Sequence, residues 1–168
     1  MRSHMKIAYC LSAVLCLSVL GCSSENPRVV TRLNEDASQM GELTSNPLQG
    51  KVITSWIDKQ HSTMSTLFGN DVAVRYARSN PQHDYPAGSV LSVVTWKQQE
   101  DPRWFGGNIP STPTAVEIVT VGMSPDNHPT YVYQDYEGTP LKKVSAQDGA
   151  TPSERAAYLL AQRAAVMP

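Results

Sequence analysis

The chain has 168 residues and a formal net charge of -1, which indicates one domain with enough residues for a hydrophobic core. The charges are unevenly distributed, because Arg2 and Lys6 precede Cys22 and every acidic residue follows it. The part after Cys22 therefore carries 12 basic and 15 acidic side chains, a net charge of -3. This balance argues against nucleic acid as a partner, since nucleic-acid binding requires basic clusters that neutralise phosphates.

The amino-terminal segment has the features of a bacterial lipoprotein signal peptide. A basic lead-in ending at Lys6 is followed by 14 uncharged residues, 7–20. That length is typical of a signal-peptide core and is too short to span a bilayer comfortably. The segment ends in Gly21 and Cys22, and a small residue before a cysteine is what lipoprotein processing requires, because the thiol carries the lipid. We expect cleavage before Cys22 and lipid attachment to it.

The expected location is therefore the cell envelope. Lipid on Cys22 would hold the exported protein at a membrane once the signal peptide, residues 1–21, has been removed. Ser23 follows the cysteine, and by resemblance to other lipoproteins this favours the outer membrane of a Gram-negative cell, facing the periplasm. The alternative is an ordinary secretory signal in which the cysteine is incidental.

The cysteine count restricts the chemistry of the mature domain. Cys10, Cys16 and Cys22 are the only cysteines in the chain. Nothing after Cys22 can therefore form a disulfide, a cysteine metal site or a cysteine nucleophile.

Residues 22–48 are polar and rich in turn-forming residues. We interpret them as a flexible tether between lipid and domain, with one short helical turn between Leu33 and Leu43. The domain itself is expected to comprise residues 49–168.

Short runs of β-type residues predict an antiparallel sheet. The runs are joined by turns rich in Gly and Pro, a pattern that favours antiparallel over parallel strands. The clearest run is 88–97, in which the side chains of alternate residues face opposite sides of the strand. We expect strands over residues 51–57, 61–68, 88–97, 114–121 and 130–136.

Two helices are predicted beside the sheet. The first begins after Asn70, a good N-cap, and ends before Pro81. The second begins at residues 151–154, where Thr-Pro-Ser-Glu combines a capping box with proline at the first helical position, and extends to Val166. The predicted fold class is α+β, a mainly antiparallel β-sheet with a helix near residues 70–79 and a C-terminal helix.

The segment between the third and fourth predicted strands carries a candidate pocket. Residues 98–113 include two aromatic residues, a pair of glycines and several charged residues. Aromatic side chains supply flat apolar walls for ligands. The alternative is that Trp104 and Phe105 cap an open end of the sheet. The candidate pocket residues are Trp96, Arg103, Trp104 and Phe105.

The sequence shows no constellation of catalytic or metal-ligating residues. His61, His83 and His128 are isolated and lack the spacing of zinc ligands, so we expect no metal ion. There is no Gly-x-Ser-x-Gly elbow and no glycine-rich phosphate loop. Each histidine is interpreted as a surface or hydrogen-bonded residue, with an axial haem ligand as the alternative.

Two segments of the chain together carry a resemblance to a known family. Residues 68–71 read Phe-Gly-Asn-Asp at a helix start, and residues 85–90 read Tyr-Pro-Ala-Gly-Ser-Val at the opening of a strand. In this order they resemble the cytochrome P-460 family of small periplasmic haem proteins, over about residues 52–136. The resemblance implies a mostly antiparallel β fold with a hydrophobic cavity. In the cytochrome members that cavity holds a c-type haem, cross-linked to a lysine, that oxidises hydroxylamine or detoxifies nitric oxide.

The chain departs from that family at the site of haem attachment. Covalent c-type haem requires Cys-x-x-Cys-His, and no cysteine follows Cys22. A haem would have to bind non-covalently, with His61, His83 or His128 as its ligand. We therefore predict an exported lipoprotein whose domain is a non-catalytic module, without cofactor, that binds a small molecule or an envelope protein. The alternative is a non-covalent haem oxidoreductase that handles hydroxylamine or nitric oxide.

Overall fold

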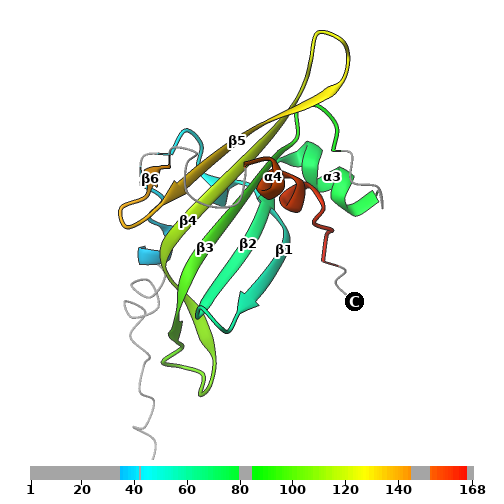
Figure 1. The fold of residues 1–168 in the computed structure, drawn as a ribbon. Helices are drawn as coiled ribbons and strands as arrows, with labels where there is room; N and C mark the ends of the chain where they lie inside the picture. The colour runs from blue at the N-terminus through cyan, green and yellow to red at the C-terminus, as the bar shows by residue number, and fades with distance from the viewer. Residues whose placement is uncertain (1–34, 42, 80–84, 145–151, 166–168) are drawn as a thin grey trace, which may run out of the picture. The chain divides into compact units, whose positions relative to one another are not determined.

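The computed structural model describes residues 35–41, 43–79, 85–144 and 152–165. Their main element is a six-stranded antiparallel sheet in which each strand pairs with the next one along the chain (Figure 1). The predicted α+β class with a mainly antiparallel sheet is confirmed. The strands are β1 (Lys51–Asp58), β2 (Thr63–Gly69), β3 (Val90–Glu100), β4 (Asn108–Met123), β5 (Pro129–Glu137) and β6 (Lys142–Lys143).

The helix α3 (Asp71–Ser79) connects β2 to β3, and its predicted N-cap is confirmed. Asn70 Oδ1 accepts hydrogen bonds from the backbone N–H groups of Ala73 at 3.0 Å and Val90 at 3.2 Å. Asn70 Nδ2 also donates to the carbonyl oxygen of Gly88 at 2.7 Å. One side chain therefore caps the helix and ties it to the beginning of β3.

The second helix, α4 (Pro152–Leu160), is shorter than predicted. The chain from residue 161 onward does not continue as a helix up to Val166, which lies outside the described residues. Instead, the backbone N–H of Ala165 donates to the carbonyl oxygen of Ile53 at 2.8 Å. The end of the described chain therefore turns back to the edge strand β1.

The segment 98–113, predicted as a loop, is mostly an extension of β3 and β4. Gln98 pairs with Pro110 and Glu100 with Asn108, so the two strands form a hairpin that projects beyond the β1–β2 turn (Figure 1). The pairing register shifts around Trp96, which accommodates the prolines of β4 within the ladder. The polar run at residues 98–101 ends the β-type pattern after residue 97, and Pro113 delays its return to residue 114, which is why the sequence predicted two shorter strands.

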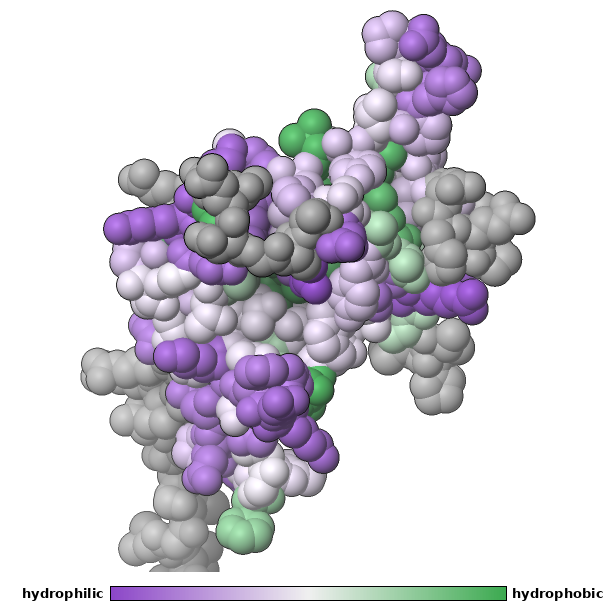
Figure 2. All heavy atoms as spheres, in the orientation of Figure 1, coloured by the Kyte–Doolittle hydropathy of each residue, from purple (hydrophilic) through white to green (hydrophobic). Residues whose placement is uncertain are grey.

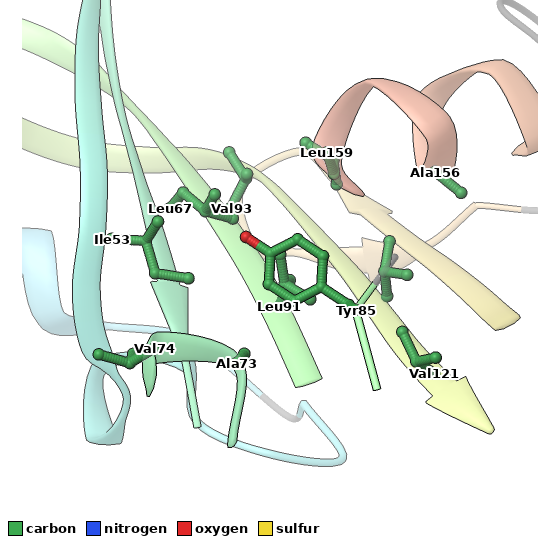
Figure 3. Packing of buried hydrophobic residues seen from close by; sticks show 11 residues of the cluster. Ile53, Leu67, Ala73, Val74, Tyr85, Leu91, Val93, Val121, Ala156 and Leu159 are labelled. Atoms are coloured by element: carbon green, nitrogen blue, oxygen red, sulfur yellow. The ribbon is translucent and has the colours of Figure 1, made fainter. Parts of the chain in front are cut away.

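Side chains from α3, α4 and the sheet form the larger of two apolar clusters, on what we call the helix side of the sheet. Figure 3 shows the Tyr85 ring among these residues, with Ala156 and Leu159 contributed by α4. Tyr85 Oη donates to the carbonyl oxygen of Gln162 at 3.2 Å, and burial raises the pKa of Tyr85 to about 12. The buried members are Ile53, Leu67, Ala73, Val74, Tyr85, Leu91, Val93, Val119, Val121, Ala156 and Leu159.

The opposite face of the sheet is covered by the amino-terminal described segment, residues 35–50. This segment contains two short 3-10 helices, η2 (Asp36–Ser38) and η3 (Pro47–Gln49). Trp96 Nε1 donates to the carbonyl oxygen of Ala37 at 2.8 Å, and Met40 packs into the apolar cluster. The buried members of this cluster are Met40, Val94, Trp96, Val116, Ile118 and Tyr136.

The domain therefore begins earlier than predicted. Residues 35–48 were expected to belong to a flexible tether, but their apolar side chains close one face of the sheet. Thr44 Oγ1 also lies 3.1 Å from Tyr136 Oη, within hydrogen-bonding distance. Only the residues between Cys22 and Glu35 can still be interpreted as a tether.

None of the helices in the described part of the chain combines the length and the apolar composition needed to cross a bilayer. The predicted signal peptide, the predicted lipid-attachment residue Cys22 and the histidine His83 lie outside the described residues.

Candidate functional site

Polar side chains gather on the helix side of the sheet, beside α4. Glu117 of β4 pairs in register with Asp135 of β5, and Val119 pairs with Tyr133. Since alternate residues of a strand share a face, Glu117, Tyr133 and Asp135 lie on the same side as the buried Val119. We call these three residues, together with Arg155 of α4, the polar cluster.

Glu117 is the centre of the polar cluster and accepts three hydrogen bonds. Tyr133 Oη donates to Oε1 at 2.6 Å, while Arg155 donates from Nε to Oε1 at 2.8 Å and from Nη2 to Oε2 at 2.5 Å. Only 8% of Glu117 is exposed, and a carboxylate this buried is stable only with such partners. The hydrogen bond to Glu117 raises the pKa of Arg155, and burial together with Glu117 raises that of Tyr133.

Aromatic contacts extend the polar cluster to the first strand. The guanidinium carbon of Arg155 lies 5.0 Å from the centre of the Tyr158 ring, a cation–π geometry. Tyr158 in turn makes an edge-to-face contact with Trp56 of β1, with ring centres 6.5 Å apart. The α4 helix is thus fixed to β4 by charge and to β1 by the edge-to-face contact of two aromatic side chains.

Asp135 is the member of the polar cluster whose pKa is moved toward neutral pH. Burial raises its pKa to about 6, and the neighbouring carboxylates of Glu117 and Glu137 act in the same direction. A carboxyl group with that pKa exchanges a proton near neutral pH, which is the property required of a general acid or base. Charge repulsion beside a structural ion pair has the same effect, so Asp135 is a candidate for either role.

The four predicted pocket residues do not converge. Trp96 is only 5% exposed and packs under residues 35–50, on the face away from the helices. Arg103, Trp104 and Phe105 lie instead at the tip of the β3–β4 hairpin, where Trp104 is 74% exposed and Phe105 is fully exposed. The two tip aromatics therefore neither line a pocket with Trp96 nor cap the end of the sheet.

The two described histidines lie in turns at opposite ends of the strands. His61 follows β1, and its Nδ1 lies 2.7 Å from Asp58 Oδ2; this hydrogen bond lowers the pKa of Asp58. His128 precedes β5, and its backbone N–H donates to Ser124 Oγ at 3.2 Å. Among the described residues, no group of three or more His, Cys, Asp or Glu side chains is placed to hold a metal ion.

His61 meets one requirement of a haem ligand and fails another. A carboxylate on Nδ1 orients an imidazole and leaves Nε2 free for a metal, the arrangement that Asp58 provides. A haem also needs an apolar enclosure, whereas the His61 side chain is 68% exposed. The described surroundings of His61 therefore do not fit an enclosed haem.

The sequence interpretation did not identify the polar cluster, although one feature pointed to it. Glu117 is the single charged residue in the predicted strand 114–121. A charge within a buried strand requires a partner, so a basic residue elsewhere in the chain could be expected to face it. Nothing local to Glu117 indicates that this partner is Arg155 of the C-terminal helix.

The sequence matches no model of a known protein family, and no curated protein matches it significantly. The resemblance to cytochrome P-460 proteins stays a prediction.

Replacing Arg155 by methionine should destabilise the domain by about 2 kcal/mol. Arg155→Met keeps much of the aliphatic stem but leaves the Glu117 carboxylate buried without its bidentate partner. Urea unfolding at neutral pH measures the loss. Arg163→Met, a change at an exposed arginine just after α4, is the matched control and should unfold like the native protein. The double variant Glu117→Gln/Arg155→Met should recover part of the lost unfolding free energy, because it removes the buried charge. Equal stability of Arg155→Met and native protein would contradict a structural ion pair.

Replacing Asp135 by asparagine should stabilise the domain at neutral pH. The pKa of Asp135 is higher in the folded than in the unfolded chain, so its protonation favours the folded state. That stabilisation is present below about pH 4 and is lost as the pH rises through about 6. Because Asp135 is only half-buried, solvent screening limits the expected gain in Asp135→Asn to about 1 kcal/mol at neutral pH.

The measurement for Asp135→Asn is the difference in unfolding free energy from the native protein, followed from acid to neutral pH. The difference should widen as the pH rises, whereas Asp126→Asn, in the exposed β4–β5 turn, should show no such trend. A difference that is constant with pH would show that Asp135 ionises normally in the folded protein.

Proposed function

We propose that this protein is an exported, lipid-anchored component of the cell envelope whose sheet domain is a non-catalytic binding or interaction module. The observation that carries the proposal is the uncharged signal-peptide core, residues 7–20, followed by Gly21 and Cys22. Lipid on Cys22 holds the domain at the periplasmic face of the outer membrane. The partner class is a small molecule or another envelope protein.

The organisation of the described chain supports this role. The sheet has its own core on both faces, with no cysteine in the sequence after Cys22. Such a domain folds without disulfides or cysteine-bound metal and needs only a short linker to its anchor. In the polar cluster, Glu117, Tyr133 and Arg155 are bonded to one another and fix α4 to the sheet, which favours a structural role over a reactive one.

We also propose that the domain is cytochrome P-460-like, although it lacks the attachment motif for covalent haem. The two segments that carry the resemblance contact each other through Asn70, which bonds to Gly88 and Val90. A helix between the second and third strands of an antiparallel sheet accompanies this contact. These features support a shared fold with an altered use.

Changing Cys22 to serine should abolish lipid attachment and the cleavage before residue 22 that depends on it. Cys22→Ser removes the thiol that carries the lipid, so that the precursor is neither acylated nor processed. Incorporation of labelled palmitate and the size of the protein on a gel measure both effects. Ser23→Ala, which changes the neighbouring hydroxyl and keeps the thiol, is the control and should remain acylated and processed. Equal palmitate incorporation into Cys22→Ser and native protein would overturn the lipid anchor.

A haem protein that handles hydroxylamine or nitric oxide is the second candidate function. The observation that favours it is the Asp58–His61 pair, whose geometry leaves Nε2 of His61 free for iron. The exposure of this imidazole argues against it, so we place haem binding second.

We expect the purified protein to show no Soret band after incubation with haemin and dialysis. Absorption spectroscopy of the membrane-extracted protein and of the haemin-treated protein makes the measurement. A band that persists in native protein and in His128→Ala but shifts in His61→Ala would establish the second candidate in place of the first. A band that shifts in His83→Ala instead would assign haem to that residue.

A further inference from the structure

The tip of the β3–β4 hairpin exposes two large aromatic side chains at adjacent positions. Trp104 is 74% exposed and Phe105 is fully exposed, the two most exposed large apolar side chains among the described residues. Figure 1 shows the hairpin extending past the β1–β2 turn, and Figure 2 shows hydrophobic colour at its end below a hydrophilic region. We call Trp104 and Phe105 the aromatic tip.

The turn that carries the aromatic tip has a defined backbone structure. The backbone N–H of Trp104 donates to the carbonyl of Asp101 at 3.2 Å, and that of Gly107 donates to the carbonyl of Trp104 at 2.9 Å. Asp101 Oδ1 accepts from the backbone N–H of Arg103 at 2.9 Å. Gly106 adopts a φ of 75°, a conformation that other residues rarely take. The turn thus holds both aromatic side chains outward in water rather than folding them back.

The first described residues of the chain lie close to the base of the same hairpin. Ala37 is bonded to Trp96, and Trp96 lies eight residues before Trp104. At about 3.3 Å per strand residue, the backbone of the tip lies at most about 26 Å from that of Trp96. Twelve residues, 23–34, separate Cys22 from Glu35, and the thirteen steps between these two residues span at most about 45 Å. A lipid on Cys22 and the aromatic tip can therefore reach the same membrane surface.

We propose that the aromatic tip inserts into the interfacial layer of the membrane that holds the Cys22 lipid, which gives the domain a second contact and a fixed orientation. This inference rests on the proposed lipid anchor. Tryptophan favours the membrane–water interface, because its ring is apolar and its N–H is polar. A lone aromatic pair binds membrane weakly, but the anchor raises its effective concentration at the surface.

The size and charge of the tip favour lipid over a protein partner. Two side chains at the end of a narrow hairpin offer far less than the roughly 800 Å² per partner of a specific protein interface. Glu100 and Asp101 outnumber Arg103, so the tip has no basic surplus that would select anionic lipid. Insertion should therefore occur in zwitterionic membranes and should be insensitive to salt.

The test uses the lipidated protein with Phe105→Cys, which creates a single free thiol because no cysteine follows Cys22. The thiol carries an environment-sensitive fluorophore, and the protein is reconstituted into phosphatidylcholine vesicles. We expect a blue shift of its emission and quenching by doxyl-labelled lipid, both unchanged in high salt. The matched control is Asp126→Cys with the same fluorophore, in the β4–β5 turn at the opposite end of the strands, and its emission should remain that of a water-exposed label.

A second measurement starts from native protein, with both aromatic side chains in place, and compares it with Trp104→Phe. In the native lipidated protein, brominated lipid should quench part of the tryptophan fluorescence, and Trp104→Phe should remove that quenched part. The other two tryptophans should not contribute, because Trp96 is buried and Trp56 packs against the core and Tyr158. Quenching that is the same with and without Trp104 would overturn the proposal.

The outcomes separate this inference from the lipid anchor. Palmitate labelling first establishes whether Cys22 is acylated. Acylated protein whose label at position 105 stays in water contradicts membrane insertion and leaves the proposed function intact. If Cys22 is not acylated, the proposed anchor fails; Cys22 is then changed to serine so that position 105 keeps the single thiol of the mature protein, and the unacylated protein is mixed with the same vesicles. A blue shift at position 105 would then support insertion by the tip itself, and no shift would overturn it.

Discussion

The structure depends on the need to cover both faces of a single sheet. Strand β3 illustrates the constraint: Leu91 and Val93 point to one side, Val94 and Trp96 point to the other, and all four are buried. An exposed apolar face of this kind costs free energy in proportion to its area, so a second layer is required on each side. The helices α3 and α4 supply one layer, and residues 35–50 supply the other.

Covering the second face with the amino-terminal segment has a consequence for the whole protein. The segment belongs to the folded domain from Glu35 onward, which leaves only twelve residues between it and Cys22. A lipid there would keep the domain close to the membrane instead of on a long, freely moving linker. Short tethering is the condition under which a weak second contact, such as an aromatic side chain at the interface, fixes orientation.

The sequence predicted the elements of this fold better than their long-range partners. Alternation over 88–97, the capping by Asn70 and the end of that helix before Pro81 are local patterns, and the structure bears out the strand and the cap. The alternation also placed apolar residues on both sides of the strand. Nothing in the sequence of residues 22–48 showed that part of this segment covers one of those two sides. Their polar composition suggested a tether, although a few apolar side chains such as Met40 are enough to seal a face.

The candidate site shows the same limit. Aromatic residues in 98–113 suggested a pocket, because aromatic side chains supply flat apolar walls for a ligand. The pairing of β3 with β4 carries them away from the core and from Trp96. Glu117 and Arg155 are 38 residues apart, and only packing of α4 on the sheet brings them together. Local sequence patterns thus pointed to individual residues such as Trp104. Which side chains they contact in the folded protein depends on how strands and helices far apart in the sequence pack together.

The two ends of the sheet have different surroundings under the proposed membrane orientation. The β1–β2 turn and the aromatic tip share one end, and α3 and the β4–β5 hairpin occupy the other (Figure 1). With the tip in lipid, the second end points into the periplasm, where a soluble partner has access. Met123 of β4 and Tyr131 of β5 are exposed near this end, on the two strands that also carry Glu117, Tyr133 and Asp135. An anchor at one end therefore leaves Met123 and Tyr131 accessible at the other, as a binding module requires.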